Sequence, residues 1–190
     1  MDTSASLLQR LRQQGDDADW QRLVRLYTPL MRTWLGRTVR QADDVNDLMQ
    51  QVFMVVLSKL PDFIHSGRTG AFRHWLRTIT VNHVRAFWRT RRLPTGNADA
   101  EAVLDQLTDP ASELSRQWDR EHDCHIAHKV LDHVEPEFRP ATWRAFCRLV
   151  LDDAAPEAVA SELGLSVNAV LIAKSRVLRR LRQEVEGLLD

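Results

Sequence analysis

The chain has few of the residues that mark disulfide-rich, thiolate-metal or membrane proteins. Its 190 residues include two cysteines, Cys124 and Cys147, with seven glycines and seven prolines. Two cysteines without a C-x-x-C pair predict neither a disulfide framework nor a thiolate zinc site, and they fit a reducing compartment. No run reaches the ~20 apolar residues of a membrane span, and the first residues lack the features of a signal peptide. We therefore expect a cytoplasmic protein without a membrane segment.

The formal net charge is zero, but the charges are segregated along the chain. Residues 63–98 contain seven arginines and no acid, and residues 163–183 contain five cations and no acid. Between these basic segments, residues 99–123 carry eight acids against two arginines. Two basic segments separated by an acidic one predict a protein that binds a polyanion at two places.

Apolar residues recur at steps of three and four, which predicts an all-α fold. Four helices are expected before Pro94, and Pro61 and Pro94 end two of them. The stretch after Pro94 has weak periodicity and an acidic bias, as in a linker. The predicted architecture is two small helical domains, at 1–93 and 113–190, joined by a flexible acidic linker at 94–112. Helices of the second domain are expected at 113–134, 137–151, 156–163 and 167–188.

Residues 156–182 have the spacing of a helix-turn-helix. Ala160 is small enough for two helices to approach, Gly164 suits the left-handed turn that ends the first helix, and Ser166 can cap the second. The second helix would present polar groups to base edges near its start and cations to phosphates further along. The competing interpretation is a helical hairpin with a solvated basic face.

Aromatic and arginine side chains alternate between Phe72 and Arg92, after a basic loop that contains glycine. Flat rings and polar groups suit unstacked bases, so opened DNA is a plausible ligand. The spacing of Phe72, Trp75, Leu76 and Ile79 is that of core residues. The better functional candidates are Asn82, Arg85, Trp88 and Arg89.

Two further clusters raise the question of metal binding. Asp43, Asp44 and Asp47 have the spacing of a motif that binds magnesium and diphosphate, but a second acidic motif is missing from the sequence. We favour helix capping and a protein-contact face there. The cluster His122, Cys124, His125 and His128 would need a convergent third or fourth ligand to bind zinc, so a variable helical surface is preferred. We expect no cofactor and no catalytic site.

Together these motifs resemble the extracytoplasmic-function (ECF) sigma factors of the sigma-70 family. The first half of the likeness is the Asp-Asp-Val-Asn-Asp-Leu-Met-Gln-Gln-Val-Phe segment at 43–53, the Phe-Arg-His-Trp-Leu segment at 72–76, Asn82 with Arg85, and the arginine-rich end at 89–92. The resemblance implies that the first of these segments docks on RNA polymerase, through Asp44, Asp47, Leu48, Gln50, Gln51 and Phe53. It also implies that the later part melts and reads the −10 element, through His65, Ser66, Gly67, Arg68, Thr69, Arg73, Asn82, Arg85, Trp88 and Arg89.

The second half of the likeness is the helix-turn-helix, which in this family reads the −35 element. Leu171, Ala173 and Leu178 stand where the family often has a lysine or arginine, and Gln51 stands where glutamate is common. The resemblance and the helix-turn-helix spacing leave as −35 candidates Ser166, Asn168, Ala169, Lys174, Ser175, Arg176, Arg179 and Arg180.

The sequence therefore predicts a non-enzymatic sigma factor whose partners are core RNA polymerase and promoter DNA, as a −35 duplex and an opened −10 strand. An anti-sigma factor is a further candidate partner. One competing hypothesis is a helix-turn-helix regulator that acts without polymerase. The other is an all-α metal-dependent diphosphate enzyme built on Asp43, Asp44 and Asp47.

Overall fold

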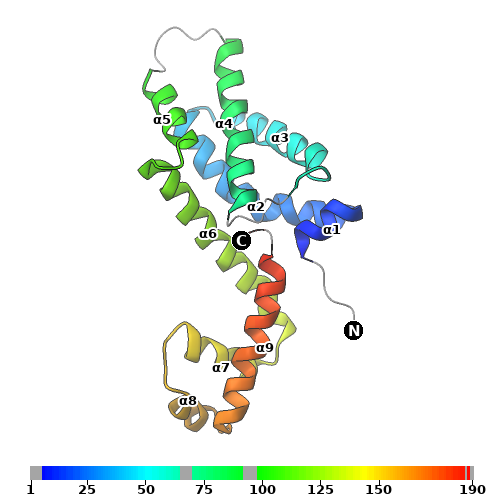
Figure 1. Cartoon of the computed structure of the whole chain (residues 1–190), viewed down its shortest axis with the longest axis vertical. Coiled ribbons are helices and arrows are strands. Elements are labelled where there is room, and N and C mark those ends of the chain that lie inside the picture. Colours follow the sequence, from blue (N-terminus) through cyan, green and yellow to red (C-terminus); the bar gives the residue numbers. More distant parts are fainter. Residues whose placement is uncertain (1–5, 65–69, 92–97, 187, 189–190) are drawn as a thin grey trace. The chain divides into compact units, whose positions relative to one another are not determined.

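The computed structural model describes residues 6–64, 70–91, 98–186 and 188 (Figure 1). All regular structure in these ranges is helical, which confirms the predicted all-α class. By its internal contacts the chain divides into two compact units, treated separately below. Of the described residues, the first unit comprises 6–126 with Glu186 and Leu188, and the second comprises Ala127–Val185. Among the described residues no single helix is long and apolar enough to cross a membrane. The helices Pro156–Leu163 and Val167–Val185 pass that test only when the two, bent by 103°, are taken together.

The first unit contains α1 (Leu7–Gln14), α2 (Asp17–Thr38), α3 (Ala42–Lys59), α4 (Ala71–Arg91), α5 (Ala98–Thr108) and the first part of α6 (Glu113–Val134). Each of the first four helices packs on the next along the chain. Two starts are set by local sequence: Ser6 and Gln9 form a reciprocal capping box for α1, and the Asp16 carboxylate accepts from the Asp19 N–H at the start of α2. Helix α3 ends at Lys59 with Leu60 as its C-cap, immediately before Pro61, as expected.

Aromatic side chains fill the core of the first unit. Tyr27 of α2 lies edge-on to Phe72 of α4 with ring centroids 5.7 Å apart, and both are fully buried. Trp34 of α2 meets Trp118 of α6 at 4.7 Å. Aromatic pairs at these distances contribute beyond their buried area, so α6 is held in the same core as α2 and α4.

Residues 98–112 differ from the flexible linker that the sequence predicts. Residues 98–108 form α5, which packs on α4, and Leu104 and Leu107 of α5 are buried. Residues 94–97 of the expected linker lie outside the described residues. The compact unit continues to Ile126 instead of ending at 93, because the apolar side of α5 and the start of α6 join its core. How function divides between domains stays a prediction.

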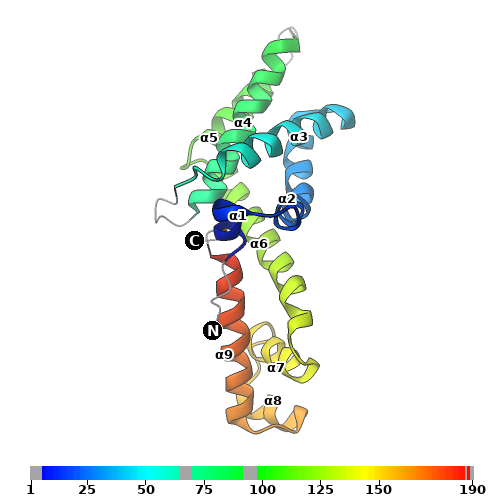
Figure 2. The ribbon, with the colours of Figure 1, turned by 90° about the vertical axis from the view of Figure 1, so that its right-hand side faces the viewer.

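The second unit contains the end of α6, a 3-10 turn at Glu135–Glu137, α7 (Pro140–Val150), α8 (Pro156–Leu163) and α9 (Val167–Val185). Pro140 and Pro156 stand at the first turns of their helices, where the missing N–H costs nothing. The three helices α7, α8 and α9 pack on one another, and Figure 2 shows α8 beside the end at which α9 begins. Their shared core consists of Ala145, Leu149, Val159, Ala160, Val170 and Ala173.

Candidate nucleic-acid interface

Helices α8 and α9 have the geometry of a helix-turn-helix. Gly164 adopts a left-handed conformation with φ of 64°, and the Leu165 N–H donates to the Ala160 carbonyl at 2.9 Å, which closes the end of α8. The Ser166 hydroxyl then accepts from the Ala169 N–H at 3.2 Å and caps α9. The two helices meet at 103°, within the usual range for this motif. The helix-turn-helix predicted from Ala160, Gly164 and Ser166 is therefore confirmed.

One face of α9 is exposed along the whole length of the helix. Its members follow the pattern i, i+1, i+4, i+5 and so on, as expected when the opposite face packs on α7 and α8. Of the predicted −35 residues, Asn168, Ser175, Arg176 and Arg179 lie on this face, while Ala169 and Lys174 are half-buried. The exposed face, which we call the α9 outer face, consists of Val167, Asn168, Leu171, Ile172, Ser175, Arg176, Arg179 and Arg182.

Two predicted −35 residues have internal tasks. Ser166 is the cap of α9. Arg180 makes a bidentate contact with Glu137, at 2.7 Å for both bonds, and a third bond of 2.7 Å with Glu184. Burial opposes ionisation there, but the two carboxylates raise the pKa of Arg180. Arg180 therefore ties α9 to the 3-10 turn, and a phosphate would have to compete with both carboxylates for it.

In the first unit, α4 carries the predicted −10 residues. Asn82 and Arg89 are exposed, and Trp88 is half-buried. His65, Ser66, Gly67, Arg68 and Thr69 lie outside the described residues. Phe72, Leu76 and Ile79 are buried in the core, as their spacing predicts, and Trp75 packs against Phe63 and Phe72.

Arg73 and Arg77 hold α4 against α6. Arg77, whose side chain is 3% exposed, donates to Asp119 at 2.9 Å and to the Ser115 carbonyl at 3.2 Å. Arg73 pairs with Asp123 at 2.8 Å and lies 3.4 Å from Asp119. Burial lowers the pKa of Arg77, and Asp119 opposes that effect. Arg73, predicted as a −10 contact, is thus ion-paired inside the unit with Asp119 and Asp123 of α6.

Arg85 is engaged by α5. Its Nε donates to Glu101 at 3.1 Å and its Nη2 to Asp105 at 2.5 Å. These acids belong to the segment that was expected to be a linker. Arg85 keeps about a third of its side chain exposed, so a ligand can reach it only in competition with the two carboxylates.

The predicted polymerase-docking residues of α3 separate into two groups. Asp47, Gln50 and Gln51 are exposed, whereas Leu48 is fully buried and Asp44 is 7% exposed. Phe53 is half-buried. Leu48 and Asp44 therefore support the helix from inside and do not present a contact surface.

Sequence reasoning missed two large apolar side chains on α3. Met54 is 69% exposed and Leu57 is 48% exposed. With Asp47 and Gln50 they follow steps of three and four, so they lie on one side of the helix. The signal was present in the run Val52–Leu57, because six successive apolar residues exceed what one buried face of a helix can take up.

The candidate metal ligands do not converge. Asp43 and Asp47 are exposed while Asp44 is buried, so the three carboxylates do not share an open face. In the described ranges no group of three or more histidine, cysteine, aspartate or glutamate side chains is placed to hold a metal ion.

The histidines of α6 are used in packing. His122 is fully buried, with one ring nitrogen 3.0 Å from the Tyr27 hydroxyl and the other 3.0 Å from Asp123. Burial lowers the pKa of His122, which keeps the ring neutral, and burial also raises the pKa of Tyr27. A neutral ring whose Nδ1–H donates to Asp123 can accept a hydrogen bond from the Tyr27 hydroxyl at Nε2. His125 similarly lies 2.6 Å from the Leu26 carbonyl.

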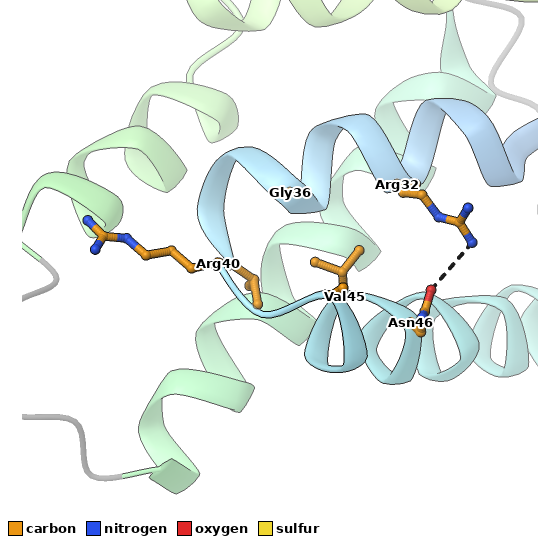
Figure 3. A pocket seen from close by; sticks show the side chains of 7 residues that line it. Arg32, Gly36, Arg40, Val45 and Asn46 are labelled. Atoms are coloured by element: carbon orange, nitrogen blue, oxygen red, sulfur yellow. Dashed lines mark hydrogen bonds between the residues drawn. The ribbon is translucent and has the colours of Figure 1, made fainter.

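An open hollow of about 410 Å³ lies between the end of α2 and the start of α3 (Figure 3). Arg32 and Asn46 are joined across it by a hydrogen bond of 3.4 Å, and Arg40 lies at its other side. The rest of the lining is Gly36, Val39, Ala42 and Val45. None of the lining side chains is a carboxylate, thiol or imidazole, so the hollow brings no acid–base or nucleophilic group together.

The described residues thus expose a mixed polar and apolar side on α3, an amide and an arginine on α4, and a polar, apolar and basic face on α9. Comparison with family models gives a match of residues 23–93 to sigma-70 region 2. The matched stretch comprises α2 from Leu23 onward, α3 and α4. No curated protein matched the chain.

Proposed function

We propose that this chain, a member of the sigma-70 family of RNA polymerase sigma factors, is of the ECF type and directs core polymerase to its promoters in the cytoplasm. Family membership rests on region 2 at 23–93. The helix-turn-helix that follows it in the second unit carries the finer assignment, because the two motifs occur in the order required to read a −10 and a −35 element.

In this proposal α3 docks on core polymerase. The proposed contact surface on α3 combines one charge, one amide and one flexible apolar side chain, from Asp47, Gln50 and Met54. Methionine adapts readily to a partner surface, and an exposed apolar side chain of this size favours a protein partner.

The exposed side of α4 then holds opened DNA. Asn82 offers donors and an acceptor to the edge of an unstacked base, Arg89 neutralises phosphate, and Trp88 offers part of a ring for stacking. Holding bases outside the duplex offsets the few kcal/mol that unpairing costs. Arg85 joins this surface only when it leaves Glu101 and Asp105.

The α9 outer face enters the major groove of the upstream duplex. Asn168 lies in the first turn, where a recognition helix reaches base edges, and the exposed Arg176 and Arg179 follow further along the helix, where they can contact phosphates. No catalytic step is required of the chain, because its contribution is binding energy at three surfaces.

A transcription assay tests the proposal. Core polymerase, the complete chain, or both are incubated with a promoter library, and RNA from defined start sites is measured. We expect start-site-specific RNA only when both proteins are present. Gln50→Ala with Met54→Ala should reduce it, and the matched double variant Ser58→Ala with Lys59→Ala, also exposed on α3, should reduce it less. DNA binding by the chain without polymerase, together with no dependence of RNA on the chain, would instead establish a regulator that acts alone.

A further inference from the structure

The first two turns of the α9 outer face are almost entirely aliphatic. Val167, Leu171 and Ile172 are 36%, 45% and 42% exposed, and Asn168 is the one polar side chain among them. Cations appear on this face only from Arg176 onward. The face is therefore apolar where a recognition helix meets base edges and basic where it meets the backbone.

Only one chemical group in the major groove matches an aliphatic side chain. Guanine, adenine and cytosine edges present hydrogen-bond donors and acceptors there, and thymine adds the C5 methyl group. Leucine and isoleucine side chains facing a polar edge would strip water from donors and acceptors and return no hydrogen bond. The same side chains facing thymine methyl groups would bury apolar surface on both partners.

We infer that Leu171 and Ile172 are specificity-determining residues that read thymine methyl groups at adjacent positions of the upstream promoter element. Asn168 supplies the hydrogen-bonded base contact beside them. This inference rests on the proposed function of the second unit as a duplex reader, and it names the chemistry that this reader recognises.

The surroundings favour DNA as the occupant over a docked protein. Leu171 and Ile172 lie on the second helix of a helix-turn-helix, in the second turn after its capped start. The same exposed face continues into Ser175, Arg176 and Arg179, and residues 163–183 contain no acid. A protein bound to the aliphatic turns would also lie next to Arg176 and Arg179, with no acid of this segment to offset their charge. A DNA duplex instead supplies methyl groups to the aliphatic turns and phosphates to the arginines.

The experiment uses the complete chain bound to core polymerase and a duplex library randomised across the promoter. Sequences retained through selection should be enriched in thymine, on either strand, at neighbouring positions of the upstream element. Replacing those thymines with deoxyuridine removes the methyl groups and leaves every hydrogen-bonding group in place. We expect binding to weaken about fourfold for each methyl removed, the value of one buried carbon.

The variant Leu171→Ala with Ile172→Ala should bind thymine and deoxyuridine duplexes within twofold of each other. Both side chains are exposed and alanine favours the helix, so α9 should persist, which circular dichroism checks. Arg176→Gln is the matched variant on the same face: it should weaken both duplexes equally and keep the discrimination. Deoxyuridine placed outside the upstream element should have no effect.

Three results would overturn the inference while leaving the sigma-factor proposal intact: a selected upstream element without thymine, equal binding of the two duplexes by the natural chain, or discrimination that survives in Leu171→Ala with Ile172→Ala. A complex that selects no sequence at all would refute the proposed function, and the inference with it.

Discussion

Releasing Arg85 from α5 should strengthen the binding of single-stranded DNA. The perturbation is Glu101→Gln with Asp105→Asn, which keeps the shape of both side chains and removes their charges. In the structure Arg85 donates to both carboxylates, at 3.1 and 2.5 Å, so DNA must displace them before it can use this cation. The amides compete less well for the guanidinium, because they carry no negative charge to attract it.

The size of the effect follows from exposure. The side chain of Arg85 is 31% exposed, and those of Glu101 and Asp105 are 50% and 67% exposed. Pairs of this kind contribute roughly 0.5 kcal/mol each, so removing both should raise affinity by about 1 kcal/mol, or about fivefold. If Arg85 then neutralises one phosphate, the logarithmic salt slope should steepen by about 0.7.

Fluorescence anisotropy of a labelled single-stranded oligonucleotide, titrated with the complete chain at several salt concentrations, measures both quantities. Asp43→Asn with Asp62→Asn removes the same charge from exposed positions of the same unit and controls for net charge. Arg85→Gln supplies the second control, since in that background the α5 substitutions should have little effect. Unchanged affinity, or an equal gain in either control, would refute the competition between α5 and DNA.

Three further expectations concern stability and docking. Asp119→Asn should lower the free energy of unfolding of the first unit by about 2 kcal/mol. The loss is smaller than for a fully buried pair, because Arg77 keeps its hydrogen bond to the Ser115 carbonyl and the Asp119 side chain is about a third exposed. Urea titration followed by tryptophan fluorescence measures the loss, and a value below about 0.5 kcal/mol would contradict the prediction. Because burial holds the pKa of His122 below its usual value, the unfolded state binds the proton first, so stability should fall as the pH drops below about 6.5. The urea midpoint should track this fall, and a His122→Gln variant with the same pH dependence would exclude His122 as its source. Gln50→Ala with Met54→Ala should weaken binding to core polymerase in a competition assay and leave duplex binding by the second unit unchanged; equal core affinity would place the docking surface elsewhere.

The sequence predicted the features that depend on neighbouring residues. Gly164 and Ser166 determine where α8 ends and α9 begins through their own backbone and hydroxyl, so the helix-turn-helix could be located from its letters. Pro61 likewise follows the end of α3, and Pro140 stands at the first position of α7. Helix α7 therefore begins at Pro140 and not at the expected residue 137.

The partners of individual charges could not be predicted, because they come from distant segments. The sequence predicts Arg180 as a phosphate contact, but in the structure its guanidinium donates to Glu137, which is 43 residues away in the chain. Helix α5 was not predicted for a related reason. Leu104 and Leu107 form only a short apolar stripe between acidic residues. Two of those acids, Glu101 and Asp105, pair with Arg85, which belongs to α4. The aliphatic turns of α9 were visible in the sequence as departures from the family, but their exposure required the packing of α7 and α8.

The ion pairs between α4 and the acids of α5 and α6 bear on how the chain is shared between polymerase and the chromosome. Non-specific attachment to DNA scales with the number of phosphates that a protein can neutralise, and a genome presents at least about a million competing sites. Arg73, Arg77 and Arg85 are each matched by carboxylates of the same unit, so they contribute little to such attachment while the chain is alone. On the proposed function, a copy that is not yet bound to polymerase would therefore attach to bulk DNA less tightly than its number of arginines suggests.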